Sequence, residues 1–231
     1  MDFPLDVTNI VIETERLTLR AFTQADLQDF YNYASIPGVG EMAGWPHHES
    51  IETSRTILQM FLNNKDVFAL YHKADKKVIG SLGLHNAWIN REEEYKHLKA
   101  KNIGYVLSKD YWGMGLVPEA VNAVINYGFT TLEMEAFSIE HFVENMQSRR
   151  VIEKCGFKFV KKGRFHAKLL DKHFDELRYV LLKSEGICQF FTSQELATHY
   201  ISRERLLMPH RQTSFQYRKL LTTTKPITMI A

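Results

Sequence analysis

Cysteine is scarce in this sequence, and both a long apolar run and a strong net charge are missing. Only Cys155 and Cys188 occur in 231 residues, too few for a disulfide framework, which indicates a reducing compartment. No stretch approaches the roughly 18 uncharged apolar residues of a membrane-spanning helix, and the start, MDFPLDVTN, does not have the pattern of a signal peptide. The net charge of +2 gives no field that would attract nucleic acid or a membrane surface. We therefore expect a cytoplasmic protein with no membrane partner and no nucleic acid ligand.

The composition provides enough apolar material for one large core. Of the residues, 45% are hydrophobic and 24% are charged, and a length of 231 residues fits one domain with an appendage. The charge is uneven, because six basic and two acidic residues give residues 186–231 a net +4 and leave −2 for residues 1–185. We predict a folded domain over 1–185 and a basic C-terminal extension over 186–231, partly helical or weakly ordered. Covering a sheet and mediating a homodimer are both open roles for this extension.

The expected elements alternate between strand and helix. Apolar residues at strand spacing occur over residues 16–22, 68–71, 78–84, 103–107, 137–142, 157–160 and 177–182. Apolar residues at helical spacing occur over residues 23–33, 50–63, 118–129 and 147–155. Thr23 and Asp26 have the spacing of a capping box, and Gly156 stands where a left-handed cap ends a helix. The order predicts a mixed α/β layer protein without internal repeats.

A strand, a loop with two glycines and a helix follow one another between residues 103 and 129. In this arrangement, backbone N–H groups and the positive end of a helix converge on an anion. Gly113 and Gly115 let the backbone approach a phosphate with no Cβ in the way. The loop has neither the Gly-Lys-Ser/Thr of a P-loop nor the third glycine of a dinucleotide fingerprint. On its own, a plain tight turn explains it equally well.

A second segment, one strand further on, favours a functional interpretation of the glycine loop over a plain turn. It reads Glu144-Asn-Met-Gln-Ser-Arg-Arg-Val-Ile-Glu-Lys-Cys-Gly-Phe157. Four motifs of this sequence together resemble those of the GNAT acyltransferase superfamily. They are the Trp-Gly-x-Gly-(x)3-Glu-Ala run, the Asn-x-x-Ser pair, the Glu-Lys-x-Gly-Phe ending and an early Glu-Thr-Glu-Arg-Leu-Thr-Leu-Arg. The resemblance extends over residues 11–183 and is closest to the branch of bacterial acetyltransferases that act on ribosomal-protein N-termini. It implies the GNAT acyl-CoA N-acyltransferase fold, an α/β fold with a mixed, mostly antiparallel sheet flanked by helices. It also implies an enzyme that moves the acetyl group of acetyl-CoA to a primary amine without a metal.

The resemblance also implies a set of donor-binding residues. Backbone groups of Tyr105, Val106 and Leu107 would pair with the pantetheine arm, and Asn145 and Ser148 would lie near that arm and the thioester sulfur. The pyrophosphate loop would be formed by Trp112, Gly113, Met114, Gly115, Leu116 and Val117. Val117 is larger than the small residue usual at its position. For Asn145 and Ser148, a role as helix caps is the alternative.

The resemblance further suggests catalytic roles for Ser148 and Asn145. Many members of the family use a tyrosine as the acid for the leaving thiolate, but Ile152 occupies that position here, which makes Ser148 the candidate acid. The general base is not identified. His85, Glu140 and His141 are the nearest candidates, each with a surface or structural role as the alternative.

Two alternative functions, which belong to different classes of protein, are consistent with this sequence. The first is an enzyme whose acceptor is a protein N-terminus, an amino acid, a polyamine or an antibiotic. The second is a GNAT-fold binding module whose basic extension contacts RNA or a ribosomal surface. Retention of Gly115, Asn145 and Ser148 favours the enzyme.

Overall fold

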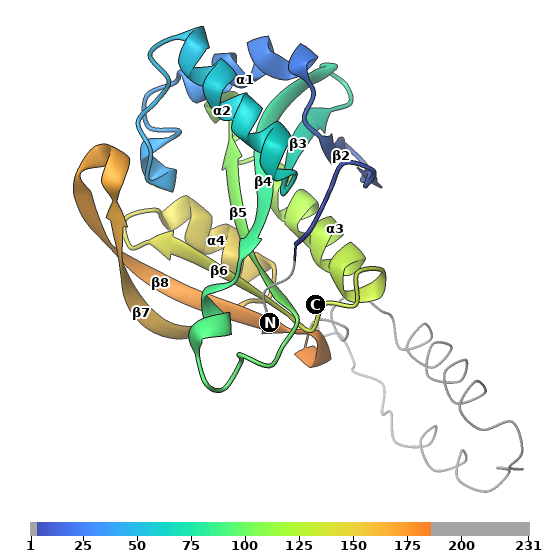
Figure 1. Ribbon diagram of the computed structural model, residues 1–231, viewed down its shortest axis with the longest axis vertical. Coiled ribbons are helices and arrows are strands. Elements are labelled where there is room, and N and C mark those ends of the chain that lie inside the picture. The colour runs from blue at the N-terminus through green and yellow to red at the C-terminus, as the bar shows by residue number, and fades with distance from the viewer. Residues whose placement is uncertain (1–3, 186–231) are drawn as a thin grey trace, which may run out of the picture. The chain divides into compact units, whose positions relative to one another are not determined.

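The computed structural model describes residues 4–185, and their strands form one mixed eight-stranded sheet (Figure 1). The strand order is β1-β2-β3-β4-β5-β6-β8-β7. All neighbours are antiparallel except β5 and β6, which are parallel. The strands are β1 Ile12–Glu13, β2 Leu17–Ala21, β3 Val67–His72, β4 Lys77–Asn86, β5 Ala100–Leu107, β6 Ala136–Phe142, β7 Lys158–Ala167 and β8 Lys172–Leu182.

Helices pack on both faces of this sheet. They are α1 Leu27–Ala34, α2 Ile51–Asn64, α3 Leu116–Thr130 and α4 Met146–Lys154. Alternate residues of β3 show the two faces, since Phe68 and Leu70 join the hydrophobic cluster of α3 and α4 while Val67 and Ala69 join that of α1 and α2. The predicted GNAT fold, with a mixed sheet flanked by helices, is therefore confirmed. No helix within residues 4–185 is long and apolar enough to cross a bilayer.

Local sequence signals account for several element ends. The carboxylate of Asp26 accepts hydrogen bonds from the Thr23 backbone N–H at 2.7 Å and from the Thr23 hydroxyl at 2.9 Å, as the capping-box spacing predicts. Ser50 caps α2 by accepting the N–H of Thr53. Gly156 follows α4 with φ of +79°, which confirms the left-handed position expected there.

The structure corrects several predicted boundaries. Helix α3 begins at Leu116 rather than at Pro118, so the proline lies within the first turn. Strands β7 and β8 extend far beyond residues 157–160 and 177–182 and pair as a long hairpin, from Lys158 opposite Val180 to Ala167 opposite Lys172. Their outer parts carry mostly exposed polar side chains, so the alternation that reveals a half-buried strand is absent. The predicted extension, 186–231, lies outside the described residues.

Candidate active site

A gap opens in the middle of the sheet between β5 and β6. The two strands pair only at Ala100–Asn102 opposite Ala136–Ser138, whereas β5 stays paired with β4 as far as Leu107. Figure 1 shows β5 and β6 diverging beyond that point. From Ile103 to Leu107, the edge of β5 that faces β6 has no strand partner among the described residues. An extended ligand with amide groups can pair with such an edge as a further strand would.

The loop between β5 and α3 has the backbone geometry of an anion site. Gly113 and Gly115 have φ values of +78° and +76°, and Gly115 is the N-cap residue of α3. A Cβ on Gly113 would meet no heavy atom within 4 Å, and one on Gly115 would meet only the Arg16 guanidinium at 3.7 Å. The glycines are therefore required by the left-handed backbone and not by crowding. The N-terminus of a 15-residue helix stands behind this open space, as an anion requires.

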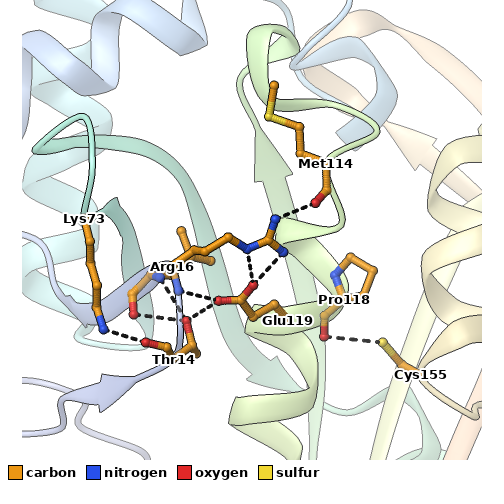
Figure 2. Close-up of polar contacts among 8 residues, drawn as sticks. Thr14, Arg16, Lys73, Met114, Pro118, Glu119 and Cys155 are labelled. Atoms are coloured by element: carbon orange, nitrogen blue, oxygen red, sulfur yellow. Dashed lines mark hydrogen bonds and ion pairs between the residues drawn. The ribbon is translucent and has the colours of Figure 1, made fainter.

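A polar network holds the same loop from behind (Figure 2). Glu119, in the first turns of α3, accepts hydrogen bonds through Oε1 from the Thr14 hydroxyl at 2.6 Å and from the Arg16 backbone N–H at 2.8 Å. Its Oε2 lies 2.7 Å from Nε and 2.6 Å from Nη2 of Arg16. The same guanidinium donates to the carbonyl oxygen of Met114 at 2.8 Å. The Glu-Thr-Glu-Arg segment and the Glu-Ala of the loop motif, far apart in sequence, thus form one structural unit.

Trp112 fastens the other end of the loop to β5. Its indole N–H donates to the carbonyl oxygen of Leu107 at 2.9 Å. One lone pair of that carbonyl is therefore engaged within the protein.

Helix α4 brings Asn145 and Ser148 to the gap. Asn145 is the N-cap residue, and its side-chain oxygen accepts the Ser148 N–H at 3.0 Å. Its side-chain amide donates to the carbonyl oxygen of Met42 at 3.3 Å. The cap role anticipated as an alternative is therefore present for Asn145. The Ser148 hydroxyl makes a different contact, with the hydroxyl of Tyr105 at 2.8 Å.

Within residues 4–185, two cavities meet at this point. The first has a volume of about 240 Å³ and is lined by every predicted donor-binding residue except Met114, whose side chain is exposed. The second has a volume of about 200 Å³ and lies on the side of β6 and the β7–β8 hairpin. The residues that line both are Met42, Ala43, Tyr105, Asn145 and Ser148. A molecule in the first cavity and one in the second would therefore both lie beside Tyr105 and Ser148.

The second cavity is lined by the carboxyl group of Glu140, whose pKa lies near neutral pH. Oε1 of Glu140 accepts a hydrogen bond from the Asn102 amide at 3.1 Å, while Oε2 is buried without a hydrogen-bond partner among the described residues. Burial and the nearby carboxylate of Glu176 raise the pKa of Glu140 to about 7. Glu176 is itself paired with Arg178, at 2.6 Å from both Nε and Nη2. Glu140 can therefore hold or release a proton at physiological pH.

The other two candidate bases have different surroundings. Nδ1 of His85 lies 2.9 Å from Asp66, on a half-exposed side chain outside the lining of both cavities. His141 lines the second cavity, but Nδ1 lies 2.7 Å from the carbonyl oxygen of Phe142 and Nε2 lies 3.1 Å from the hydroxyl of Tyr179. Both of its ring nitrogens are engaged, which leaves Glu140 as the best placed of the three.

Sequence reasoning missed the positive charge on α4. Arg150 and Lys154 line the first cavity together with Gln147. Their i, i+4 spacing within the predicted helix 147–155 was an available signal, because it places both cations on one face. It also missed the loop around Met42 and the contribution of Phe165 and Glu176 from the hairpin, for which the sequence has no local signal.

The paired histidines of the 44–49 loop have separate partners. Nδ1 of His47 lies 2.8 Å from Glu41, and Nδ1 of His48 lies 2.7 Å from the Ser54 hydroxyl. Among residues 4–185, no three His, Cys, Asp or Glu side chains gather in a way that could hold a metal ion.

These features are the ones that the resemblance to N-acyltransferases led us to expect. Residues 16–158 match the family described as Acetyltransferase (GNAT) domain. The match covers more than half of the chain, so the protein belongs to the GNAT acetyltransferase family and is an N-acetyltransferase.

Similar proteins agree with this assignment. The uncharacterized N-acetyltransferase YoaA of Bacillus subtilis is 28% identical over 152 residues, which are 64% of this chain and 82% of that protein. The putative ribosomal N-acetyltransferase YdaF of the same organism is 34% identical over 125 residues, 54% of this chain and 62% of that one. The crystal structure of spermidine N-acetyltransferase from Vibrio cholerae, in complex with CoA and spermine, has a TM-score of 0.60 at 19% identity and covers 75% of this chain and 99% of its own. The expected resemblance to a branch that includes ribosomal-protein acetyltransferases is confirmed.

Proposed function

We propose that this enzyme transfers the acetyl group of acetyl-CoA directly to a primary amine, with the donor in the first cavity and the amine in the second. The observation that carries the proposal is the meeting of the two cavities at Tyr105, Asn145 and Ser148. Direct transfer requires the attacking nitrogen to lie next to the thioester carbon, and two adjoining cavities allow this.

The donor assignment is supported by three independent features of the first cavity. The unpaired edge of β5 suits the amide groups of a pantetheine arm. The left-handed glycines before α3 suit a pyrophosphate. Arg150 and Lys154 add positive charge on α4, where their side chains line the cavity and can form charge-assisted hydrogen bonds to phosphate oxygens.

The chemistry assigns one task to each group at the junction. Glu140, as the general base, removes a proton from the ammonium of the acceptor, and the neutral nitrogen attacks the thioester carbon. A backbone N–H of β5 near Val106 or Leu107 donates to the carbonyl oxygen as negative charge develops there. The carbon–nitrogen bond forms and the carbon–sulfur bond breaks. Glu140 passes the first proton of the amine to solvent, and the bonded nitrogen releases its second proton to solvent as it becomes the amide. Ser148 passes its hydroxyl proton to the departing sulfur and regains one proton from solvent, so that one proton is released overall.

The acceptor is a protein N-terminus or a small amine. The putative ribosomal relative and the spermidine-acetylating neighbour represent these two kinds of substrate. The second cavity is lined by apolar side chains and by the carboxylates of Glu140 and Glu176, which suits the end of an aliphatic or peptide amine.

A panel of amines tests the proposal. Purified protein is mixed with acetyl-CoA and with peptides, amino acids, polyamines or aminoglycosides, and both free thiol and acetylated product are measured. The matched control for each peptide is the same peptide with a blocked N-terminus. We expect transfer to at least one class and none to the blocked peptides. Tight acetyl-CoA binding without transfer to any amine would contradict the proposal and favour a binding module.

A further inference from the structure

Two hydroxyl groups meet where the cavities join. The hydroxyl of Tyr105, from β5, lies 2.8 Å from Oγ of Ser148, from α4, and 3.3 Å from the Ser148 carbonyl oxygen. Tyr105 lines both cavities, so it lies at their junction. Ile152, at the position where the resemblance to the family would place a tyrosine, is fully buried in the core and supplies no hydroxyl. A tyrosine hydroxyl thus reaches Ser148 from a strand rather than from the helix.

The pair has two donor arrangements. Tyr105 has one proton and two oxygen neighbours. When it donates to Oγ of Ser148, the serine proton must point away from Tyr105 and is available to the cavity. When it donates to the carbonyl oxygen instead, the serine donates back to Tyr105 and its proton is occupied. The 2.8 Å contact between the two hydroxyls fits either direction, and donation by Tyr105 is the direction that frees the serine proton.

Tyr105 is suited to remain a donor. Its side chain is half-buried, and desolvation around the hydroxyl raises the pKa of Tyr105 far above the ordinary value. The phenol therefore keeps its proton throughout the pH range in which the enzyme works.

We propose that Tyr105 is a positioning residue for thiolate departure, whose hydroxyl donates to Oγ of Ser148 and turns the serine proton toward the sulfur. The inference rests on the proposed function. As the carbon–sulfur bond breaks, its electron pair goes to sulfur, which takes the Ser148 proton. Tyr105 stabilises the serine oxygen while that proton leaves and retains its own. Solvent then restores the serine proton.

A structural role for Tyr105 makes a different prediction. If Tyr105 only fastens β5 to α4 through the carbonyl oxygen of Ser148, loss of its hydroxyl changes the shape of the junction whether or not Ser148 has a hydroxyl. If Tyr105 acts through Ser148, the loss matters only while the serine proton exists. A double-mutant cycle separates the two roles.

The cycle consists of wild type, Tyr105→Phe, Ser148→Ala and the double variant. Single-turnover thiol release from acetyl-CoA is followed with a reactive amine and, separately, in water alone, because both reactions expel the same thiolate. The matched control is Tyr127→Phe, which removes the same hydroxyl from a half-buried tyrosine of α3 outside both cavities. Melting curves and calorimetric titration with acetyl-CoA accompany every variant.

We expect Tyr105→Phe to slow thiol release about 3–10-fold in the wild-type background, the range for one hydrogen bond. In the Ser148→Ala background, the same change should alter the rate less than about 2-fold, and Tyr127→Phe should leave it unchanged. Affinity for acetyl-CoA should stay the same throughout.

Equal effects of Tyr105→Phe in both backgrounds, or no effect in either, would overturn the role of Tyr105 while leaving acetyl transfer intact. Thiol release into water without transfer to any amine would contradict the proposed acceptor chemistry, and the water reaction would still complete the cycle. A wild-type protein that releases no thiol in either reaction would overturn both. If Tyr105→Phe does not fold, Tyr105→Met, which removes the hydroxyl and fills the site flexibly, replaces it in the cycle.

Discussion

Arg16 and Glu119 are 103 positions apart in sequence, yet two guanidinium nitrogens of Arg16 lie 2.6 and 2.7 Å from one carboxylate oxygen of Glu119. The same arginine holds the carbonyl oxygen of Met114, within the glycine loop. The ion pair therefore links the first long strand to the loop that we assign to the pyrophosphate.

Glu119→Ala should weaken both folding and donor binding. It removes the acceptor of the Thr14 hydroxyl and of three Arg16 nitrogens, in a partly buried setting. We expect the free energy of unfolding to fall by about 1.5–3 kcal/mol, the range for hydrogen bonds to a charged group, and the Kd for acetyl-CoA to rise severalfold. Denaturant unfolding and calorimetry measure the two effects. Glu153→Ala, which breaks the exposed pair with Arg149, is the control and should cost about 0.5 kcal/mol or less.

Gly115→Asp should abolish tight donor binding. The new side chain would enter the open space before α3 and put a negative charge beside the pyrophosphate. We expect a loss of about 3 kcal/mol or more, over a hundredfold in Kd.

The matched control is Gly156→Asp, at a similar φ of +79° beyond the end of α4 and outside the lining of both cavities. It carries the same backbone strain without facing the donor, so it should bind acetyl-CoA normally. Normal binding by a folded Gly115→Asp protein would leave the glycines with a turn-forming role only.

Ser148→Ala should lower kcat by about 10²–10⁴, the usual range for one acid–base group, with little change in acetyl-CoA affinity. The backbone N–H of residue 148, which Asn145 caps, is retained in this variant, so α4 should keep its start. Steady-state kinetics and calorimetry test the two parts. An unchanged kcat would return Ser148 to a purely structural role.

The pH dependence of kcat/KM should follow Glu140. A general base works when ionised, so activity should rise with pH through its pKa of about 7. Glu176→Gln removes the negative charge that helps to raise this pKa and leaves Arg178 to stabilise the Glu140 carboxylate, so the rise should move to lower pH. Asn102→Leu removes the hydrogen bond to that carboxylate and should move the rise to higher pH. A rise that stays in place in both variants would exclude Glu140 as the titrating group.

The backbone geometry of the glycine loop and of the start of α4 could be predicted from sequence, because its signals are local. Glycines that need positive φ, an N-cap residue and a helix start all depend on a few neighbouring residues, and Gly115 and Asn145 occupy these positions in the structure. The junction with the acceptor side could not. The contact of Tyr105 with Ser148 depends on the angle between a strand and a helix 43 residues apart. The approach of Glu176 to Glu140 depends on the register of β8 against β6.

The divergence of β5 from β6 leaves part of the β5 edge without a strand partner among the described residues. The two halves of the sheet share only a three-residue parallel pairing at this seam. A donor lying along Ile103–Leu107 would act as a temporary structural component and join the halves where the polypeptide does not. The amides of that edge should exchange with deuterium quickly in the free protein and slowly with CoA bound. The fold should also gain about 2.7 kcal/mol of stability at CoA concentrations 100 times the Kd.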